Sequence, residues 1–236
     1  MLPLHAVFRS SYLVLVFFVV LLMLLSSATQ AKAIPVELRE TEQGWRLLRA
    51  GEPYFILGAC GDAPLDQLAA AGANSVRTWG GDDIDARLDK AHALGLSVTV
   101  GIWLGHERHG FDYDDKTQVQ KQLEHARRIV LKYKDHPAVL LWGIGNEVEG
   151  FESGDSPAIW KAVNEVAAMV KKLDPLHPTM TVTADIGGKR IEYIHQRCPA
   201  IDIHGINSYG GSNSLANRYQ KGGASKPYVL TEFGPA

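Results

Sequence analysis

The sequence predicts an α/β fold in which parallel strands alternate with helices and close into a (β/α)8 TIM barrel. Three observations support this prediction. Short apolar segments recur along the chain, amphipathic helical segments separate them, and polar residues follow most apolar segments at their C-terminal ends. Repeated strand–helix units form a parallel sheet, either open or closed. Because all strand ends meet at one face of a closed barrel, we favour the barrel over an open sheet.

Seven segments have the composition of buried parallel strands. They are short, rich in apolar or β-branched residues and mostly bounded by turn-forming residues, as expected for strands covered on both faces. The expected strands are 54–58, 74–78, 97–103, 138–146, 179–184, 201–208 and 227–232. A complete barrel of this class has eight strands, so we expect a barrel that is truncated after the seventh strand.

Helical periodicity occupies the intervals between these strands. Apolar residues within 119–133 are spaced four and three residues apart, and 159–173 repeats this spacing, so each segment presents one apolar face to the sheet. We expect shorter helices at 64–72, 84–94 and 188–197. Residues 36–49 precede the first strand and are expected to form a short N-terminal β-hairpin.

The first 33 residues differ in composition from the rest of the chain. An uninterrupted apolar stretch from Tyr12 to Leu25 follows Arg9 and precedes small residues near Ala33, which is the layout of a secretory signal peptide. The alternative is an uncleaved membrane anchor, although a bilayer span needs about 20 residues. We therefore expect export, to a periplasmic, extracellular or membrane-anchored location, with residues 34–236 forming the barrel.

Charge and cysteine content limit the possible partners and crosslinks. The formal net charge is -2, so nothing indicates binding to nucleic acid, and a membrane would be contacted only through an uncleaved N-terminal segment. Cys60 and Cys198 are expected at opposite ends of the barrel, whereas a disulfide needs Cα atoms within about 7 Å. We therefore expect two free thiols.

Two glutamates lie at the C-terminal ends of expected strands. The apolar run 138–144 leads into Asn146 and Glu147, and the run 228–231 leads into Glu232. A buried carboxylate is costly unless it has a partner or a chemical task. Two carboxylates at one barrel mouth can provide acid–base and nucleophilic chemistry on one glycoside. We therefore predict that both glutamates are catalytic.

These motifs resemble those of the clan A retaining glycoside hydrolases, and most closely the TIM-barrel domain of glycoside hydrolase family 2. The resemblance rests on Gly145-Asn146-Glu147, on Thr231-Glu232-Phe233-Gly234 and on the segment 74–79, and it covers about residues 36–236. It implies an enzyme without a cofactor that acts on an oligo- or polysaccharide. It also implies double displacement through a covalent glycosyl-enzyme intermediate.

The resemblance implies a role for each residue that matches the family pattern. Glu147 would be the general acid/base and Glu232 the nucleophile, while Arg77 would keep Glu232 ionised. Asn146 would hydrogen-bond the 2-hydroxyl group of the sugar, and Tyr209 would orient Glu232. Arg77, Asn146 and Tyr209 are therefore candidate substrate-binding residues.

The remaining polar and aromatic candidates have two readings each. Trp103 could stack on a sugar or pack in the core, and His204 could line the pocket or complete a buried network; we place both among the candidate substrate-binding residues. The loop 105–115 lacks the zinc-protease spacing, so it is interpreted as a polar loop and no metal site is predicted. Glu149 is interpreted as a residue of the pocket rim.

Several functions stay open on the residues alone. Hydrolysis of a β-glycoside leads, and β-glucan-type transglycosidation differs from it only in the acceptor that resolves the intermediate. A truncated barrel could instead be an inactive carbohydrate-binding module. A metal-dependent hydrolase built on residues 106–115 is a further alternative. The sugar, the linkage and the oligomeric state do not follow from the sequence.

Overall fold

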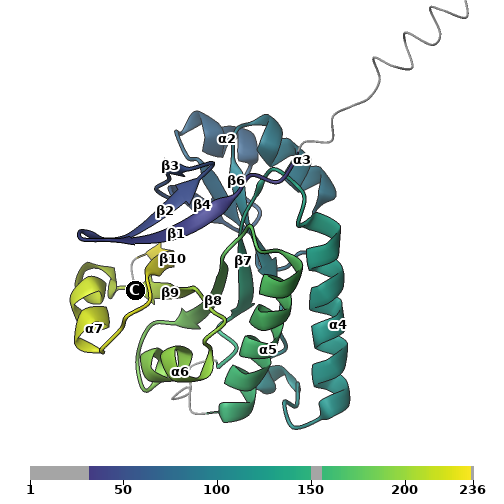
Figure 1. Ribbon diagram of the computed structural model, residues 1–236, viewed down its shortest axis with the longest axis vertical. Coiled ribbons are helices and arrows are strands. Elements are labelled where there is room, and N and C mark those ends of the chain that lie inside the picture. The colour runs from purple at the N-terminus through teal and green to yellow at the C-terminus, as the bar shows by residue number, and fades with distance from the viewer. Residues whose placement is uncertain (1–31, 150–155, 235–236) are drawn as a thin grey trace, which may run out of the picture. The chain divides into compact units, whose positions relative to one another are not determined.

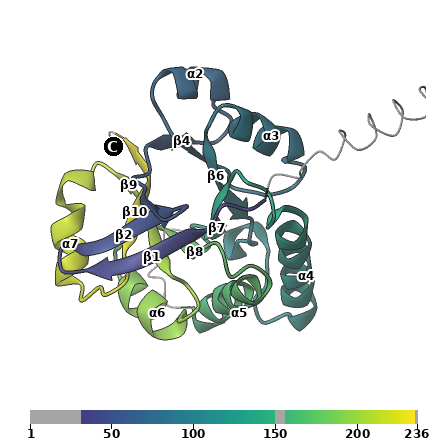
Figure 2. The ribbon, with the colours of Figure 1, turned by 45° about the horizontal axis from the view of Figure 1, so that its top comes forward.

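Seven parallel strands form the centre of the structure, and each pairs with its neighbour in the chain, in the order β10-β9-β8-β7-β6-β5-β4. The computed structural model describes residues 32–149 and 156–234. The sheet curls into a nearly closed barrel, and Figure 2 shows helices α2 to α7 arranged around the outside of the strands. The expected TIM-barrel class and its seven strands are confirmed. The segment 1–33, which we expect to be a signal peptide or membrane anchor, lies almost wholly outside the described residues.

Strands and helices alternate along the chain (Figure 1). The barrel strands are β4 (Gly58–Cys60), β5 (Ser75–Arg77), β6 (Ser97–Ile102), β7 (Val139–Asn146), β8 (Thr179–Ala184), β9 (Ile203–Tyr209) and β10 (Tyr228–Gly234). The helices are α2 (Leu65–Ala70), α3 (Asp85–Ala93), α4 (Lys116–Tyr133), α5 (Pro157–Leu173), α6 (Arg190–Arg197) and α7 (Leu215–Lys221), with the 3-10 turns η1 (Glu107–His109) and η2 (Ser212–Ser214).

The N-terminal hairpin closes the end of the barrel at which the parallel strands begin. Strands β1 (Val36–Thr41) and β2 (Gly44–Arg49) pair in antiparallel register, as expected, and the short strand β3 (Glu52–Pro53) extends them. Val36 packs with Leu140, which lies near the start of β7. The mouth formed by the C-terminal strand ends lies at the opposite end of the barrel.

Helices α4 and α5 cover the outer face of the sheet with the apolar stripes that the sequence predicts. Val130 and Val163 are fully buried in the same cluster as the β6 and β7 side chains. Asp115 begins α4 by accepting hydrogen bonds from the backbone N–H groups of Thr117 and Gln118, at 2.8 and 3.3 Å. Such a cap is worth about 1 kcal/mol, so local sequence and packing define the same helix.

The first barrel strand begins later than expected. Of the predicted strand 54–58 only Gly58 belongs to β4, and Phe55 and Leu57 are exposed by 84% and 58%. The amide of Asn74 explains this, because it donates to the carbonyl of Phe55 and accepts from the N–H of Leu57. The Asn74 side chain thus forms the hydrogen bonds that a neighbouring strand would otherwise form with Phe55 and Leu57.

Strands β4 and β10 are the two edges of the described sheet. Between them lies a cavity of about 850 Å³, lined mainly by apolar side chains of the hairpin, of the segment 53–59 and of β10. Cys60, at the end of β4, and Cys198, after α6, are both free, as expected. Over residues 32–149 and 156–234, no helix combines the length and the hydropathy that a bilayer crossing requires.

Candidate active site

A sharp turn of the backbone at the end of β7 positions Glu147. The register of β7 against β8 shifts between Ile144 and Asn146, and Gly145 and Glu147 have φ angles of 71° and 50°. A Cβ atom on Gly145 would lie 2.8 Å from Val148 Cγ1, so this position requires glycine. Bulges of this kind re-aim the side chains that follow them. The turn therefore sets the direction of Glu147.

Glu232 on β10 accepts hydrogen bonds from three side chains. Its Oε1 atom accepts from Arg77 Nη1 at 3.0 Å and from Trp79 Nε1 at 2.9 Å, and its Oε2 atom accepts from the Tyr209 hydroxyl at 2.8 Å. The Arg77 and Glu232 side chains are only 8% and 11% exposed. Donors of this kind favour the ionised carboxylate and fix its plane. Three donors thus orient the Glu232 side chain, and one of them is the Arg77 guanidinium.

A continuous hydrogen-bond network joins the two glutamates. Arg77 Nη2 donates to Asn146 Oδ1 at 2.7 Å, and Asn207 Nδ2 donates to the same oxygen at 3.2 Å. Asn207 Nδ2 also donates to Glu147 Oε1 at 2.7 Å. The path from Glu232 to Glu147 therefore runs through Arg77, Asn146 and Asn207. The structure brings Arg77, Asn146 and Tyr209 together with both predicted catalytic residues.

The charges of the site keep its donors in their donating forms. Burial lowers the pKa of Arg77, and the carboxylate of Glu232 opposes that change. The hydrogen bond to Glu232 raises the pKa of Tyr209 to about 12, and desolvation adds to it. Tyr209 is therefore neutral and able to donate throughout the physiological pH range.

Trp103 and His106 lie at the end of β6, beside Asn146. The Trp103 side chain is 41% exposed, and its ring lies 4.8 Å from the ring of His106. Since a carbonyl oxygen can only accept, His106 Nε2–H donates to Asn146 O at 2.9 Å. Burial lowers the pKa of His106. Trp103 thus presents an open aromatic face, while His106 supports the backbone that carries Glu147.

The position of His204 contradicts the substrate-binding role predicted for it. His204 is fully buried and, because side chains alternate along a strand, lies on the opposite face of β9 from Asn207. Thr183 Oγ1 donates to the Asp185 carbonyl at 2.7 Å, so His204 Nε2 donates to Thr183 Oγ1 at 2.8 Å. Burial lowers the pKa of His204 to about 3. His204 belongs to the buried network that was its alternative reading.

Glu149 is a core residue, and its assignment to the pocket rim is wrong. The residue is only 5% exposed, and its Oε1 atom accepts from Arg190 Nε at 2.9 Å and from the N–H of Ala184 at 3.0 Å. Burial raises the pKa of Glu149, and the Arg190 charge opposes this change. The ion pair joins the segment after β7 to α6. Glu149 follows the bulge by two residues, and its side chain points into the core rather than toward the pocket.

The sequence analysis did not predict three contacts that hold the carboxylates, two of them direct and one through Asn207. Trp79 donates to Glu232, Asn207 donates to Glu147, and Thr231 Oγ1 donates to Asn207 Oδ1 at 2.7 Å. A usable signal existed at two of these positions. Asn207 lies two residues before Tyr209, and Trp79 two residues after Arg77, so each pair shares one face of an extended segment.

Loop 105–115 contains the turn η1 (Glu107–His109) and the N-cap of α4. In the part of the chain that the structure describes, no group of three or more His, Cys, Asp or Glu side chains is arranged to hold a metal ion.

Residues 88–236 match the family model described as "Glycosyl hydrolases family 2, TIM barrel domain". A comparison with curated proteins found no match. Similar solved structures include a β-D-glucuronidase from Dictyoglomus thermophilum (20% identity, TM-score 0.63, 85% of this chain and 39% of that chain). Others are a β-galacturonidase from Eisenbergiella tayi bound to galacturonate (19%, 0.63, 85% and 38%) and a β-glucuronidase from an uncultured Clostridium (22%, 0.63, 85% and 39%).

The chain spans about two fifths of the length of these three structures, and the likeness shows a shared fold. The family model, by contrast, covers more than half of the chain, including both strand-end glutamates. This protein therefore belongs to the glycosyl hydrolases of family 2, within which it corresponds to the TIM barrel domain.

Proposed function

We propose that this barrel hydrolyses a β-glycoside with retention of configuration, with Glu232 as the nucleophile and Glu147 as the general acid and base. Family membership supports a glycosidase. One observation carries the division of roles. Glu232 accepts from Arg77, Trp79 and Tyr209, which suits a charged nucleophile, whereas Glu147 accepts from the neutral amide of Asn207.

In the first step Glu232 attacks the anomeric carbon while the carboxylic acid of Glu147 protonates the glycosidic oxygen. The aglycone leaves as an alcohol, and an ester bond joins the sugar to Glu232. In the second step the Glu147 carboxylate takes a proton from water, the water oxygen attacks the anomeric carbon, and the ester bond breaks. Two inversions at one carbon restore its original configuration.

The donors around Glu232 contribute in both steps. Before attack, Arg77 and Tyr209 hold the carboxylate in one orientation, which lowers the entropic part of the barrier. In the second step the same donors stabilise the negative charge that returns to Glu232 as the ester bond breaks. Asn146 lies between the two glutamates, where its amide can contact a sugar hydroxyl, and Trp103 offers a ring for stacking on the sugar.

The substrate is proposed to be an oligo- or polysaccharide with a β-linkage. One of the similar structures is a β-galacturonidase bound to galacturonate, and others are β-glucuronidases. The first screen should therefore contain aryl β-glucuronides and β-galacturonides beside neutral aryl β-glycosides.

The roles of the two glutamates can be separated by substitution. Glu232→Ala should lower turnover of an activated aryl β-glycoside by roughly 10⁴-fold or more. Glu147→Ala should regain activity when azide is added, and the product should be a β-glycosyl azide, because a small anion can resolve the intermediate without a general base. Glu124→Ala, at an exposed position on α4, is the control and should be fully active. Full activity of Glu232→Ala would end the proposal.

We also propose that residues 1–33 direct export of the chain, on the basis of their basic start, apolar middle and small-residue end. Expression of the full chain followed by fractionation and N-terminal mass spectrometry tests this. Recovery outside the cytoplasm with a new N-terminus near residue 34 indicates a cleaved signal, and membrane recovery with an intact N-terminus indicates an anchor. Recovery of the intact chain in the cytoplasm alone would contradict export.

A further inference from the structure

The tip of β9 contacts both glutamates with alternate side chains. Asn207 donates to Glu147 and Tyr209 donates to Glu232, at 2.7 and 2.8 Å. Ser208, the residue between them, is fully buried and faces away from the barrel mouth. A displacement of this one residue would move the donors of both carboxylates together, because the three residues are consecutive on one strand.

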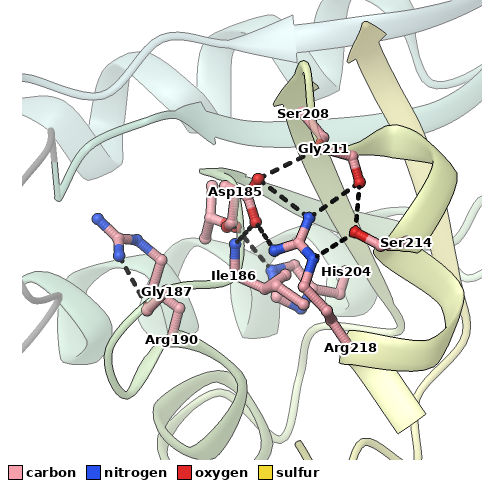
Figure 3. Close-up of polar contacts among 10 residues, drawn as sticks. Asp185, Ile186, Gly187, Arg190, His204, Ser208, Gly211, Ser214 and Arg218 are labelled. Carbon is pink, nitrogen blue, oxygen red and sulfur yellow. Dashed lines mark hydrogen bonds and ion pairs between the residues drawn. The ribbon is translucent and has the colours of Figure 1, made fainter. Parts of the chain in front are cut away.

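Ser208 is held from behind by Asp185. Ser208 Oγ donates to Asp185 Oδ2 at 3.0 Å (Figure 3). The backbone N–H of Asp185 donates to the carbonyl of Asn207 at 2.7 Å. Asp185 has a φ angle of 58°, which is uncommon for a residue other than glycine and persists only where the surroundings determine it. Asp185 therefore fixes β9 through both its side chain and its backbone.

Arg218 on α7 clamps Asp185 in turn. Its Nη1 and Nη2 atoms donate to Oδ1 and Oδ2 of Asp185, at 2.6 and 3.3 Å. Nη2 also donates to Gly211 O at 3.1 Å, and Nε donates to Ser214 Oγ at 3.2 Å (Figure 3). This guanidinium thus ties the end of β8 to the loop that continues from Tyr209. A planar fork of donors is well suited to hold such a geometry.

The loop that Arg218 holds leaves no room for a side chain at Gly211. A Cβ atom there would lie 2.7 Å from Arg218 Nη2 and 3.0 Å from Ser208 Oγ. The preceding residue, Gly210, donates its N–H to the carbonyl of Gly234 at 3.0 Å, two residues beyond Glu232 on β10. The cluster is therefore continuous with the strand that carries the nucleophile.

Asp185 carries its negative charge at neutral pH. Burial acts to raise the pKa of Asp185, but the hydrogen bonds from Arg218, from the N–H of Ile186 and from Ser208 outweigh it and hold that pKa below the usual value. The carboxylate is therefore available as an acceptor for Arg218 and Ser208 under the conditions in which the barrel would work.

We propose that Asp185, Ser208 and Arg218 form a positioning clamp behind β9, which sets the places of Asn207 and Tyr209 and through them the orientation of both glutamates. This inference rests on the proposed function. The three clamp residues are positioning residues, since their contacts to the carboxylates run through their neighbours. A purely structural role would lower stability and leave kcat unchanged. The clamp predicts a loss of kcat with little change in KM.

Kinetics of four variants test the clamp. Ser208→Ala removes only the side-chain link between Asp185 and β9 and should lower kcat about threefold to tenfold. Arg218→Gln should lower kcat about tenfold or more, with KM within about twofold of the wild-type value. Arg218→Lys retains the charge and should recover part of this loss. Arg127→Gln is the matched control, because Arg127 pairs with Glu124 on α4 and is 40% exposed, close to the 37% of Arg218. Unchanged kcat in Ser208→Ala and Arg218→Gln would overturn the clamp.

A structural measurement keeps the clamp testable apart from activity. If the wild-type chain hydrolyses no glycoside in the screen, the proposed function fails, and crystal structures of the variants decide on the clamp alone. In Ser208→Ala and Arg218→Gln the distance between the Tyr209 hydroxyl and Glu232 Oε2 should exceed 3.5 Å, against 2.8 Å here. Melting temperatures confirm that the variants are folded. An unchanged distance in both folded variants would refute the positioning role.

Discussion

At the scale of single residues, the hydroxyl of Tyr209 is the donor to Glu232 that can be removed with the least disturbance. Tyr209 is 55% exposed, and only its hydroxyl contacts the carboxylate. A hydrogen bond to a charged group is worth about 1.5–3 kcal/mol. Arg77, by contrast, also holds Asn146, so its removal would disturb both halves of the network.

Tyr209→Phe should lower kcat roughly 10- to 100-fold, in line with that hydrogen-bond energy. Steady-state kinetics of the variant and the wild-type chain measure this loss. Tyr228→Phe on the neighbouring strand is the control. An unchanged kcat in Tyr209→Phe would show that this donor has no catalytic role.

His204 makes a second prediction at this scale, which concerns stability. Its pKa is about 3 in the folded chain because of burial, against about 6.5 in an unfolded chain. Between these values the unfolded state binds a proton that the native state does not, so stability falls as pH drops below about 6.5. The slope from this residue is at most about 1.4 kcal/mol per pH unit.

Urea unfolding at pH 7, 6 and 5 should therefore show a shallower pH dependence for His204→Gln than for the wild-type chain. The exposed residue His92 on α3 provides the control, and His92→Gln should leave the slope unchanged. Equal slopes in the wild-type chain and in His204→Gln would mean that the buried imidazole is protonated in the native state.

At the scale of elements, the turn after β7 sets the direction of Glu147. Gly145→Ala should destabilise the protein by about 1–3 kcal/mol, because it combines a φ angle of 71° with a Cβ atom 2.8 Å from Val148 Cγ1. It should also lower kcat. Gly95→Ala is a matched control, since Gly95 has a φ angle of 73° but no heavy atom within 4 Å of its Cβ position. Denaturation and kinetics of both variants separate backbone strain from the steric contact. Equal losses of stability would contradict the account.

The fold was predicted mainly from the spacing of apolar residues, and the site mainly from the polar residues at the ends of the expected strands. Strand-end motifs placed Glu147, Glu232, Arg77 and Asn146 at one mouth, because parallel strands of one barrel end on the same side. The spacing of Trp79 from Arg77 indicated a shared face, but its contact with Glu232 was not predicted, because that contact depends on how the sheet curls to bring the end of β5 toward β10.

Two errors show which physical features a single sequence hides. His204 was misplaced because one position along a strand reverses the face that a side chain occupies. Helix α7 was missed because only Leu215 and Tyr219 of its seven residues are buried, which is too short a pattern to show helical periodicity. Yet α7 supplies Arg218, so the clamp behind β9 was invisible from the sequence.

At the scale of the whole barrel, the edges β4 and β10 and the apolar cavity between them are its least protected surface. Phe55, Leu57 and Phe233 are exposed by 84%, 58% and 67%. Unpaired strand edges beside exposed apolar side chains favour association between chains. The rest of the sheet is covered by helices.

Leu57→Lys should therefore raise the protein concentration at which light scattering increases. Leu131→Lys provides the matched control, because Leu131 is 51% exposed on α4, away from both edges. Dynamic light scattering over a concentration series measures the difference. An equal effect of both substitutions would show that the strand edges do not direct association.

The most direct test of the proposed function is to trap the glycosyl-enzyme intermediate. A 2-deoxy-2-fluoro derivative of whichever aryl β-glycoside the wild-type chain hydrolyses slows both steps, and an activated leaving group keeps the first step fast enough for the intermediate to accumulate. Peptide mass spectrometry should then find one sugar bound covalently to Glu232. A sugar on any other residue, or a hydrolysis product of inverted configuration without an adduct, would contradict the account.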